Sequence, residues 1–197
     1  PVQHRKAQAQ VDLAVIRARD ALIRARTKLI NHARGVAKSM GGRLPKKTTR
    51  SFDSRLGYAV PEPLHPALLP LLEAIEGLRA QILSYNRRIE DMARDSYPET
   101  ARLMQVRGVG ALSALSFVLT LEDPQRFARS RTVGAYLGLV PGRNSSGESD
   151  PQRRITKEGD EFLRKTLVQC AHYLMGPFGE DCDLRRHGEK IAQRGGK

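Results

Sequence analysis

Residues 11–36 have the sequence VDLAVIRARDALIRARTKLINHARGV, in which apolar residues recur at alternating steps of four and three. A repeat of about 3.5 residues is typical of a helix that packs against another helix. The pattern predicts one long helix over residues 5–39, ended by the glycines at 41 and 42 and by Pro45. The predicted contact row is Val11, Val15, Ala18, Leu22, Ala25, Leu29 and Val36, and the basic residues are assigned to other positions.

A second helix of the same kind is predicted over residues 66–96, after a connector at residues 40–66 in which Phe52 and Leu56 can support a short helical turn. Two such helices predict a long antiparallel coiled-coil hairpin, or pairing with the hairpin of another subunit in a homodimer or a dimer of dimers. The sequence leaves this choice open. The predicted row is Leu68, Leu71, Ile75, Leu78, Ile82, Tyr85, Ile89 and Met92.

The chain is strongly basic, with 34 Lys and Arg against 21 Asp and Glu and a net charge of +13. The first 50 residues alone hold 13 of the basic residues and only two acids, Asp12 and Asp20. Such a balance indicates a polyanionic partner, most often nucleic acid. Arg24, Arg26 and Lys28 are therefore candidate nucleic-acid contacts, although a solvated helix face is the simpler interpretation of them.

Other classes of protein are disfavoured by what the sequence lacks. No apolar run approaches the roughly 18 residues that a membrane helix needs, so no membrane association is predicted. Cys170 and Cys182 form no CxxC pair and are predicted to be reduced thiols. His172 has no apparent further ligands around it, so no metal site is predicted in this chain.

From Pro98 onward we expect a compact helical domain, residues 98–197, distinct from the coiled-coil region at residues 1–97. The segment around Val106-Arg-Gly-Val-Gly110 resembles the turn of a helix-hairpin-helix. Gly108 and Gly110 are predicted to adopt positive φ and to expose backbone amides where a DNA phosphate can dock, with Arg107 beside them. A plain αα-corner is the alternative. The apolar segment 111–121 is predicted to be a buried helix.

A loop rich in serine and glycine, YLGLVPGRNSSG at residues 136–147, is followed by RRITKEGD at residues 153–160. Ser145 and Ser146 are adjacent, and basic residues stand on both sides of them. Arginine binds phosphate in a bidentate manner, so these cations suit a phosphate target, and serine needs such help to act as a nucleophile. A polar linker is the alternative. The flanking basic residues are Arg143, Arg153, Arg154 and Lys157.

Local signals place helices around this loop, with at most a short hairpin about the loop itself. Ser130 is a candidate N-cap for the helix before it. Thr156 or Asp160 is a candidate N-cap for a helix from about 159 to 175, on which Arg164 and Lys165 are expected at the surface.

Several motifs, in this order and spacing, resemble the C-terminal part of insertion-sequence transposases with a DEDD N-terminal domain. That family includes Piv-type DNA invertases and bridge-RNA-guided recombinases. The resemblance covers about residues 5–175. It is carried by the basic helix segment 24–31, Arg107-Gly-Val-Gly110, Glu122-Asp-Pro-Gln-Arg-Phe127, Ala135-Tyr-Leu-Gly-Leu-Val-Pro141, Ser145-Ser-Gly147, Arg154-Ile-Thr-Lys157, and Gly159-Asp160 with Leu163-Arg164.

The resemblance implies an enzyme, a DNA transposase or recombinase, whose serine attacks a DNA phosphodiester and forms a covalent phosphoserine link. The nucleophile then maps to Ser146, with Ser145 as the adjacent alternative. The implied partners are DNA and a structured guide RNA, and the implied location is the bacterial cytoplasm.

The family's carboxylates belong to a segment upstream of the one matched here, and this sequence shows no counterpart of that segment. We therefore expect the chain to be the coiled-coil and serine domain of a larger transposase, or a truncated relative of one. It then has no cofactor of its own, needs Mg²⁺ only with the carboxylate domain, and cleaves weakly by itself. Two rival interpretations are a non-catalytic nucleic-acid-binding module, using the helix-hairpin-helix and the basic helix, and a structural coiled-coil protein.

Overall fold

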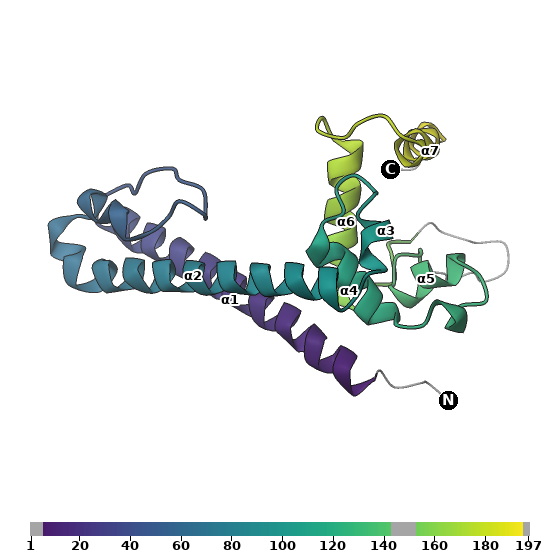
Figure 1. Ribbon diagram of the computed structural model, residues 1–197. Coiled ribbons are helices and arrows are strands. Elements are labelled where there is room, and N and C mark those ends of the chain that lie inside the picture. The colour runs from purple at the N-terminus through teal and green to yellow at the C-terminus, as the bar shows by residue number, and fades with distance from the viewer. Residues whose placement is uncertain (1–5, 143–152, 195–197) are drawn as a thin grey trace. The chain divides into compact units, whose positions relative to one another are not determined.

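The computed structural model describes residues 6–142 and 153–194. The chain divides into two compact units, Ala14–Glu90, here the hairpin unit, and Pro1–Leu13 with Asp91–Lys197, here the C-terminal unit. The elements are helices, and among the described residues extended pairing is limited to an antiparallel bridge between Pro141 and Ile155 (Figure 1). The predicted all-α fold class is therefore confirmed.

Two long helices, α1 (Ala7–Ser39) and α2 (His65–Asp95), supply most of the hairpin unit. Nε of Arg19 donates to Oδ1 of Asn86 at 2.6 Å, whereas Ala37 shares a buried cluster with Leu68. Later residues of α1 thus lie with earlier residues of α2, and the two helices run antiparallel. Their bounds agree closely with the predicted ones, and coiled-coil geometry stays a prediction.

The contact row of α1 differs from the predicted row. Val11 is 57% exposed, and Arg26 is only 8% exposed. Arg19 is also partly buried, where Asn86 accepts its hydrogen bond. The predicted row used apolar residues only and so left out arginine. The aliphatic part of an arginine side chain can nevertheless be buried between helices. The buried residues of α1 within this unit are Val15, Ile16, Arg26, Ile30, Ala33 and Ala37.

The row of α2 was half correct. Four of its predicted members are buried, and the other four are only partly buried. After two of these four, Leu71 and Met92, the next residue is buried instead, namely Leu72 and Ala93. The buried residues of α2 in the hairpin unit are Leu68, Leu72, Ile75, Ile82 and Ile89.

The connector folds against this core through two short 3-10 helices, η1 (Ser54–Ala59) and η2 (Glu62–Leu64). Phe52 is fully buried and Leu56 nearly so, which confirms the predicted turn of helix. Between them, buried Asp53 caps η1 and pairs with Arg55 at 2.7 Å and Arg79 at 3.1 Å. Hydrogen bonds from Arg55 lower the pKa of Asp53 below its ordinary value.

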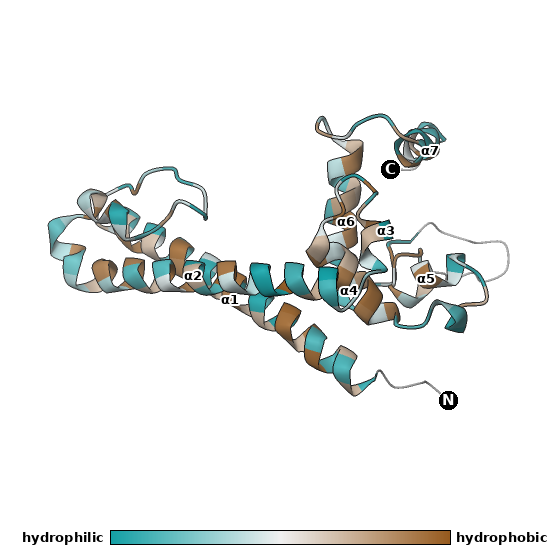
Figure 2. Ribbon diagram, viewed as in Figure 1, coloured by the Kyte–Doolittle hydropathy of each residue, from teal (hydrophilic) through white to brown (hydrophobic). Residues whose placement is uncertain are grey.

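The C-terminal unit is built around the buried helix α4 (Ala111–Leu121), which contacts α3 (Thr100–Leu103) and α6 (Glu161–Met175). Helix α6 also contacts α7 (Asp183–Gln193). Helix α4 is hydrophobic along most of its length, and Ala114, Leu115 and Leu119 are buried (Figure 2). The prediction of a buried helix over residues 111–121 is confirmed.

The start of α1 is tied to the C-terminal unit by polar contacts. The backbone amide of Lys6 donates to Glu122 at 2.8 Å. The Tyr97 hydroxyl donates to Asp12 at 2.6 Å, and burial together with this bond raises the pKa of Tyr97 to about 12. Both cysteines are free thiols. Among the described residues, no helix has the length and apolar character needed to cross a membrane.

Candidate nucleic-acid interface

The predicted nucleophiles Ser145 and Ser146, and the flanking Arg143, lie outside the described residues. The two backbone segments that border their loop are described, and they pair in antiparallel fashion. The amide of Gly142 donates to the Arg154 carbonyl at 3.0 Å, and the amide of Thr156 donates to the Val140 carbonyl at 3.0 Å. These segments, residues 138–142 and 153–157, are here called the stem. The expectation of at most a short hairpin around the serine loop is confirmed.

The base of the stem depends on the absence of a side chain at Gly138. This glycine has φ +65°, and a Cβ built on it would lie 2.3 Å from both the backbone N and O of Glu158. Its carbonyl also accepts a hydrogen bond from the Lys157 amide at 3.1 Å. Two backbones can approach this closely only where one of them carries glycine. The glycine in the predicted loop motif therefore fixes where the stem begins.

Arg164 holds both sides of this base, which corrects the prediction that it lies on the surface of α6. It is only 8% exposed. Its Nη1 donates to the Leu137 carbonyl at 2.9 Å and to the Glu158 carbonyl at 2.6 Å. A buried guanidinium needs such acceptors, and these two belong to opposite sides of the stem. The sequence carried a weak signal for this role. Arg164 stands three residues before Leu167 of the apolar face, and residues three apart lie on the same side of a helix.

Three of the predicted phosphate ligands, Arg153, Arg154 and Lys157, lie together on the second arm of the stem and are exposed. None of them forms an ion pair with a carboxylate of residues 6–142 or 153–194. Lys157 has φ +61°, a conformation that non-glycine residues adopt rarely and at some cost. The stem therefore presents cations whose charge is not compensated within the described part of the chain.

Two capping predictions near the stem had different outcomes. The Asp160 side chain accepts a hydrogen bond from the Leu163 amide at 2.8 Å and caps α6, as predicted. Ser130 precedes α5 (Arg131–Tyr136) but has helical dihedral angles and makes no side-chain cap, so that prediction was wrong.

The turn before α4 matches its prediction only in part. Gly108 has φ +84°, as expected, but Gly110 has φ −98° and caps α4 with an extended backbone. A Cβ on Gly108 would lie 2.8 Å from the Tyr173 ring, because the turn packs against α6. Arg107 is exposed and contacts Glu180. The helix-hairpin-helix interpretation of this turn stays a prediction.

The candidate contacts on α1 do not form one exposed row. Arg24 is exposed and pairs with Asp20 at 3.0 Å, and Lys28 is exposed. Arg26 is buried, and its Nε has no hydrogen-bond partner among the described residues. Burial, together with the nearby charges of Arg50 and Arg79, lowers the pKa of Arg26. A nucleic-acid contact by these three residues stays a prediction.

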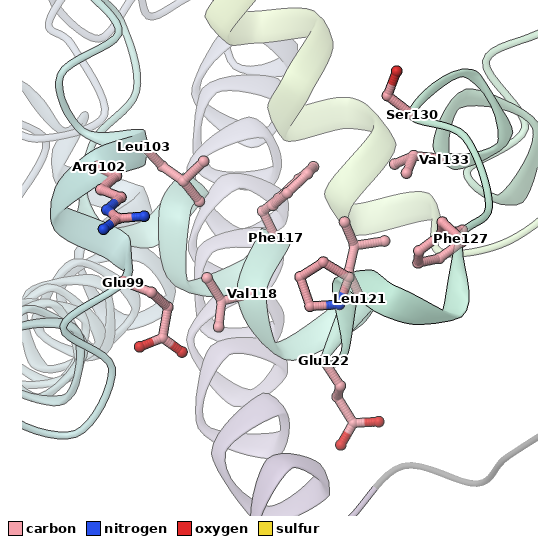
Figure 3. Close-up of a pocket in the computed structure, with 11 residues that line it drawn as sticks. Glu99, Arg102, Leu103, Phe117, Val118, Leu121, Glu122, Phe127, Ser130 and Val133 are labelled. Carbon is pink, nitrogen blue, oxygen red and sulfur yellow. The ribbon is translucent and has the colours of Figure 1, made fainter.

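An apolar cavity of about 650 Å³ lies in the C-terminal unit. Figure 3 shows hydrophobic side chains from α3, α4, the segment after α4 and α5 gathered around it, among them Leu103, Phe117 and Val133. Glu99, Arg102 and Glu122 contribute its charged groups. Its one basic lining residue, Arg102, is accompanied by two carboxylates and by mostly apolar side chains, so the lining differs from the cationic arm of the stem.

No group of three or more His, Cys, Asp or Glu residues that could hold a metal ion occurs in the described part of the chain. The described residues therefore do not fit a Mg²⁺ centre.

The chain is similar to known transposases. Residues 100–181, which include α3, α4, α5 and α6, match the family described as "Transposase IS116/IS110/IS902 family". The chain is 34% identical over 181 residues to the transposase for insertion sequence element IS1328 of Yersinia enterocolitica, covering 88% of this chain and 53% of that protein. It is 29% identical over 181 residues to the transposase for IS1111A of Coxiella burnetii, covering 88% and 49%.

A probable family 20 transposase of Pseudomonas aeruginosa is 29% identical over 188 residues, covering 92% of this chain and 55% of that protein. Over residues 100–181 the C-terminal unit therefore resembles the transposases of the IS116/IS110/IS902 family. The chain spans about half the length of the curated relatives it matches.

Proposed function

We propose that this chain is part of a DNA transposase or site-specific recombinase, and that a serine of the loop at residues 143–152 is its nucleophile. The observation that carries the proposal is the stem. A clamped antiparallel base leads into a segment with two serines, and one arm carries three exposed cations that form no ion pair within residues 6–142 and 153–194. The transposase family match over residues 100–181 and the net charge of +13 support a DNA substrate.

In the proposed step, the Ser146 hydroxyl oxygen attacks the phosphorus of a DNA phosphodiester. One phosphorus–oxygen bond forms to the serine, and the bond to one deoxyribose oxygen breaks. The serine gives up its proton and the departing oxygen takes one up, so the step needs no oxidant or reductant. The phosphoserine diester conserves the bond energy, and attack by another deoxyribose hydroxyl reverses the step and joins strands.

The basic residues have a defined electrostatic role in this proposal. Arg153, Arg154 and Lys157, with Arg143, neutralise the scissile phosphate and the charge that gathers on it in the transition state. Arg164 touches neither the serines nor the phosphate in this scheme. It is a positioning residue that holds the two arms of the stem at a fixed separation through its carbonyl contacts.

Metal chemistry is assigned to another part of the protein. Since the described residues hold no suitable ligand cluster, we propose that Mg²⁺ is bound by a carboxylate domain of the full-length parent, as the resemblance implies. We also propose that the protein binds a structured guide RNA, which predicts that RNA co-purifies with it. We further propose self-association through the long helices, which predicts a molar mass in solution of at least twice that of one chain.

The test is a denaturing-gel assay for a covalent protein–DNA adduct, using the element's end sequences, Mg²⁺, the full-length parent and this chain alone. We expect an adduct with the parent that vanishes in Ser146→Ala and survives in Ser145→Ala. The reverse result moves the nucleophile to Ser145. If the adduct persists in both variants, serine catalysis by this loop is overturned. Robust cleavage by this chain alone would overturn the need for a carboxylate domain.

The second candidate function is a non-catalytic nucleic-acid-binding module. It is favoured by the start of α4, where the N-cap Gly110 is exposed and no side chain caps the helix, so backbone amides are available to a phosphate. This function predicts salt-sensitive binding that Ser146→Ala leaves unchanged, without any covalent adduct.

A further inference from the structure

Five basic side chains surround a hollow of about 600 Å³ where α1 ends and the connector begins, within the hairpin unit. Two of them come from the last turns of α1, and the other three follow its end. We call this hollow the connector groove. Its basic residues are Arg34, Lys38, Arg43, Lys46 and Lys47, and its lining also includes Gly42, Leu44, Pro45 and Thr48.

The groove is positively charged without internal compensation. No Asp or Glu lines it, and none of its five cations forms an ion pair with a carboxylate among the described residues. Like charges gathered around one hollow repel each other, which disfavours the folded state in the absence of an anion. A bound anion would relieve the repulsion among these five cations, and the groove is open to solvent, so we infer that it binds an anion.

Capping of α1 does not account for these cations. The amide of Gly42 donates to the Ala37 carbonyl at 2.9 Å, and the amide of Gly41 donates to the Lys38 carbonyl at 3.1 Å. The Ser39 hydroxyl donates to the Val36 carbonyl at 2.8 Å. Backbone and serine donors therefore satisfy these carbonyls at the end of the helix, so the lysine and arginine head groups of the groove are not used to cap it.

One wall of the groove is held in place before any ligand binds. Nη2 of Arg34 donates to the Lys47 carbonyl at 2.8 Å, which ties the connector back to α1. The Arg34 guanidinium also lies 5.1 Å from the ring centroid of Phe52, which is fully buried. A wall fixed by a core aromatic residue loses little further freedom when it meets a ligand.

We propose that the connector groove binds the sugar-phosphate backbone of a nucleic acid. Several adjacent cations match the closely spaced charges of successive phosphates. The lining contains no aromatic residue on which a base could stack, so the contact is with the backbone and carries little sequence preference. None of the groove residues is among the candidate ligands of the stem or of the turn before α4. The inference shares with the proposed function only the nature of the partner and does not depend on serine chemistry.

The test compares two double variants of the full 197-residue chain that lose the same charge. Arg43→Gln with Lys46→Gln removes two groove cations, whereas Arg87→Gln with Arg88→Gln removes two exposed cations of α2 in the same unit. Binding to a short duplex DNA and to an RNA hairpin of matched charge is measured by fluorescence anisotropy over a range of salt concentrations. Thermal melts confirm that both variants fold, and all four positions are exposed.

We expect the groove variant to bind about tenfold more weakly and to lose about one to two units of slope in log K against log salt, on DNA, on RNA or on both. The α2 variant should retain the wild-type slope. Equal losses in the two variants would show a diffuse effect of net charge and overturn the proposal, as would no loss in either. The readout is equilibrium binding without strand cleavage, whereas the catalytic proposal is tested by the covalent adduct, so failure of one is distinguishable from failure of the other.

Discussion

Nη1 of Arg164 donates a hydrogen bond to the backbone carbonyl of Leu137 at 2.9 Å, across 27 residues of sequence. The same nitrogen donates to the Glu158 carbonyl at 2.6 Å, so one buried cation joins the end of α5 to the segment that enters α6. Backbone carbonyls are fixed more firmly than side chains, and two of them define the position of the guanidinium. The separation of the arms that border the serine loop is therefore set from inside the C-terminal unit.

Replacing Arg164 should loosen the base of the stem and lower the stability of the C-terminal unit. Arg164→Met removes both hydrogen bonds and leaves two inward-facing carbonyls without a charged donor, at a cost of about 2–4 kcal/mol in the free energy of unfolding. Urea denaturation followed by circular dichroism measures this loss. The control is Lys165→Met, which removes a neighbouring exposed cation paired with Glu161 and should change stability by less than about 1 kcal/mol.

A positioning role for Arg164 has a second readout besides stability. Adduct formation by the full-length parent should fall in Arg164→Met at temperatures where the variant is fully folded, and Arg164→Lys should restore part of it, because an ammonium can donate to both carbonyls. Normal adduct formation by folded Arg164→Met would show that the clamp only contributes stability.

Gly138→Ala should be among the most damaging single substitutions in the C-terminal unit. The new Cβ would lie 2.3 Å from the Glu158 backbone, and φ +65° disfavours any side chain there. We expect a loss of at least about 2 kcal/mol in the free energy of unfolding. The matched control is Gly134→Ala, within α5. A Cβ at this position would meet only the side chain of Val140, at an ordinary contact distance of 3.8 Å. A melting temperature unchanged by Gly138→Ala would show that the two backbones can separate without cost.

The helical elements were predictable from sequence because their signals are local. The apolar period located α1 and α2 to within about two residues, and the composition of residues 111–121 predicted a buried helix. Which residues of α1 are buried against α2 was not predictable in this way. Its contact row includes Arg26, and whether an arginine is buried depends on what the partner helix offers, such as Asn86 opposite Arg19.

The candidate site was predictable in its residue types but not in its construction. Serines between arginines and lysines indicated phosphate chemistry, and the cations of one arm do lie together. The clamp by Arg164 was missed because its acceptors are backbone carbonyls, which leave no trace in a sequence pattern. The connector groove was missed for a related reason, since Arg34 meets Lys47 only after the connector folds back on α1.

Arg26 should be a source of instability in the hairpin unit. Its buried Nε has no partner among the described residues, and its surroundings contain the further cations Arg50 and Arg79. Arg26→Met keeps the apolar stem and removes the charge, so the free energy of unfolding should rise by about 1–2 kcal/mol. Lys28→Met, exposed on the same helix, should have little effect. A lower urea midpoint in Arg26→Met would show that the guanidinium is stabilised by its surroundings.

The pairing of Asp53 with two arginines should make the hairpin unit sensitive to acid. Its folded-state pKa lies below the ordinary value of 3.8, chiefly because Arg55 donates hydrogen bonds to the carboxylate, so the unfolded chain takes up a proton more readily. The stabilisation is then fully present above that value and is lost as pH falls below it through the folded-state pKa.

Asp53→Asn should remove this dependence and cost about 1–3 kcal/mol at neutral pH, because a buried carboxylate that caps η1 and pairs with Arg79 is lost. Urea midpoints measured between about pH 5 and pH 2 should fall less steeply in Asp53→Asn than in the wild type. Glu73→Gln, at an exposed position of α2, serves as the matched control and should follow the wild-type profile. Parallel profiles for wild type and Asp53→Asn would mean that the acid sensitivity of this unit arises from other carboxylates.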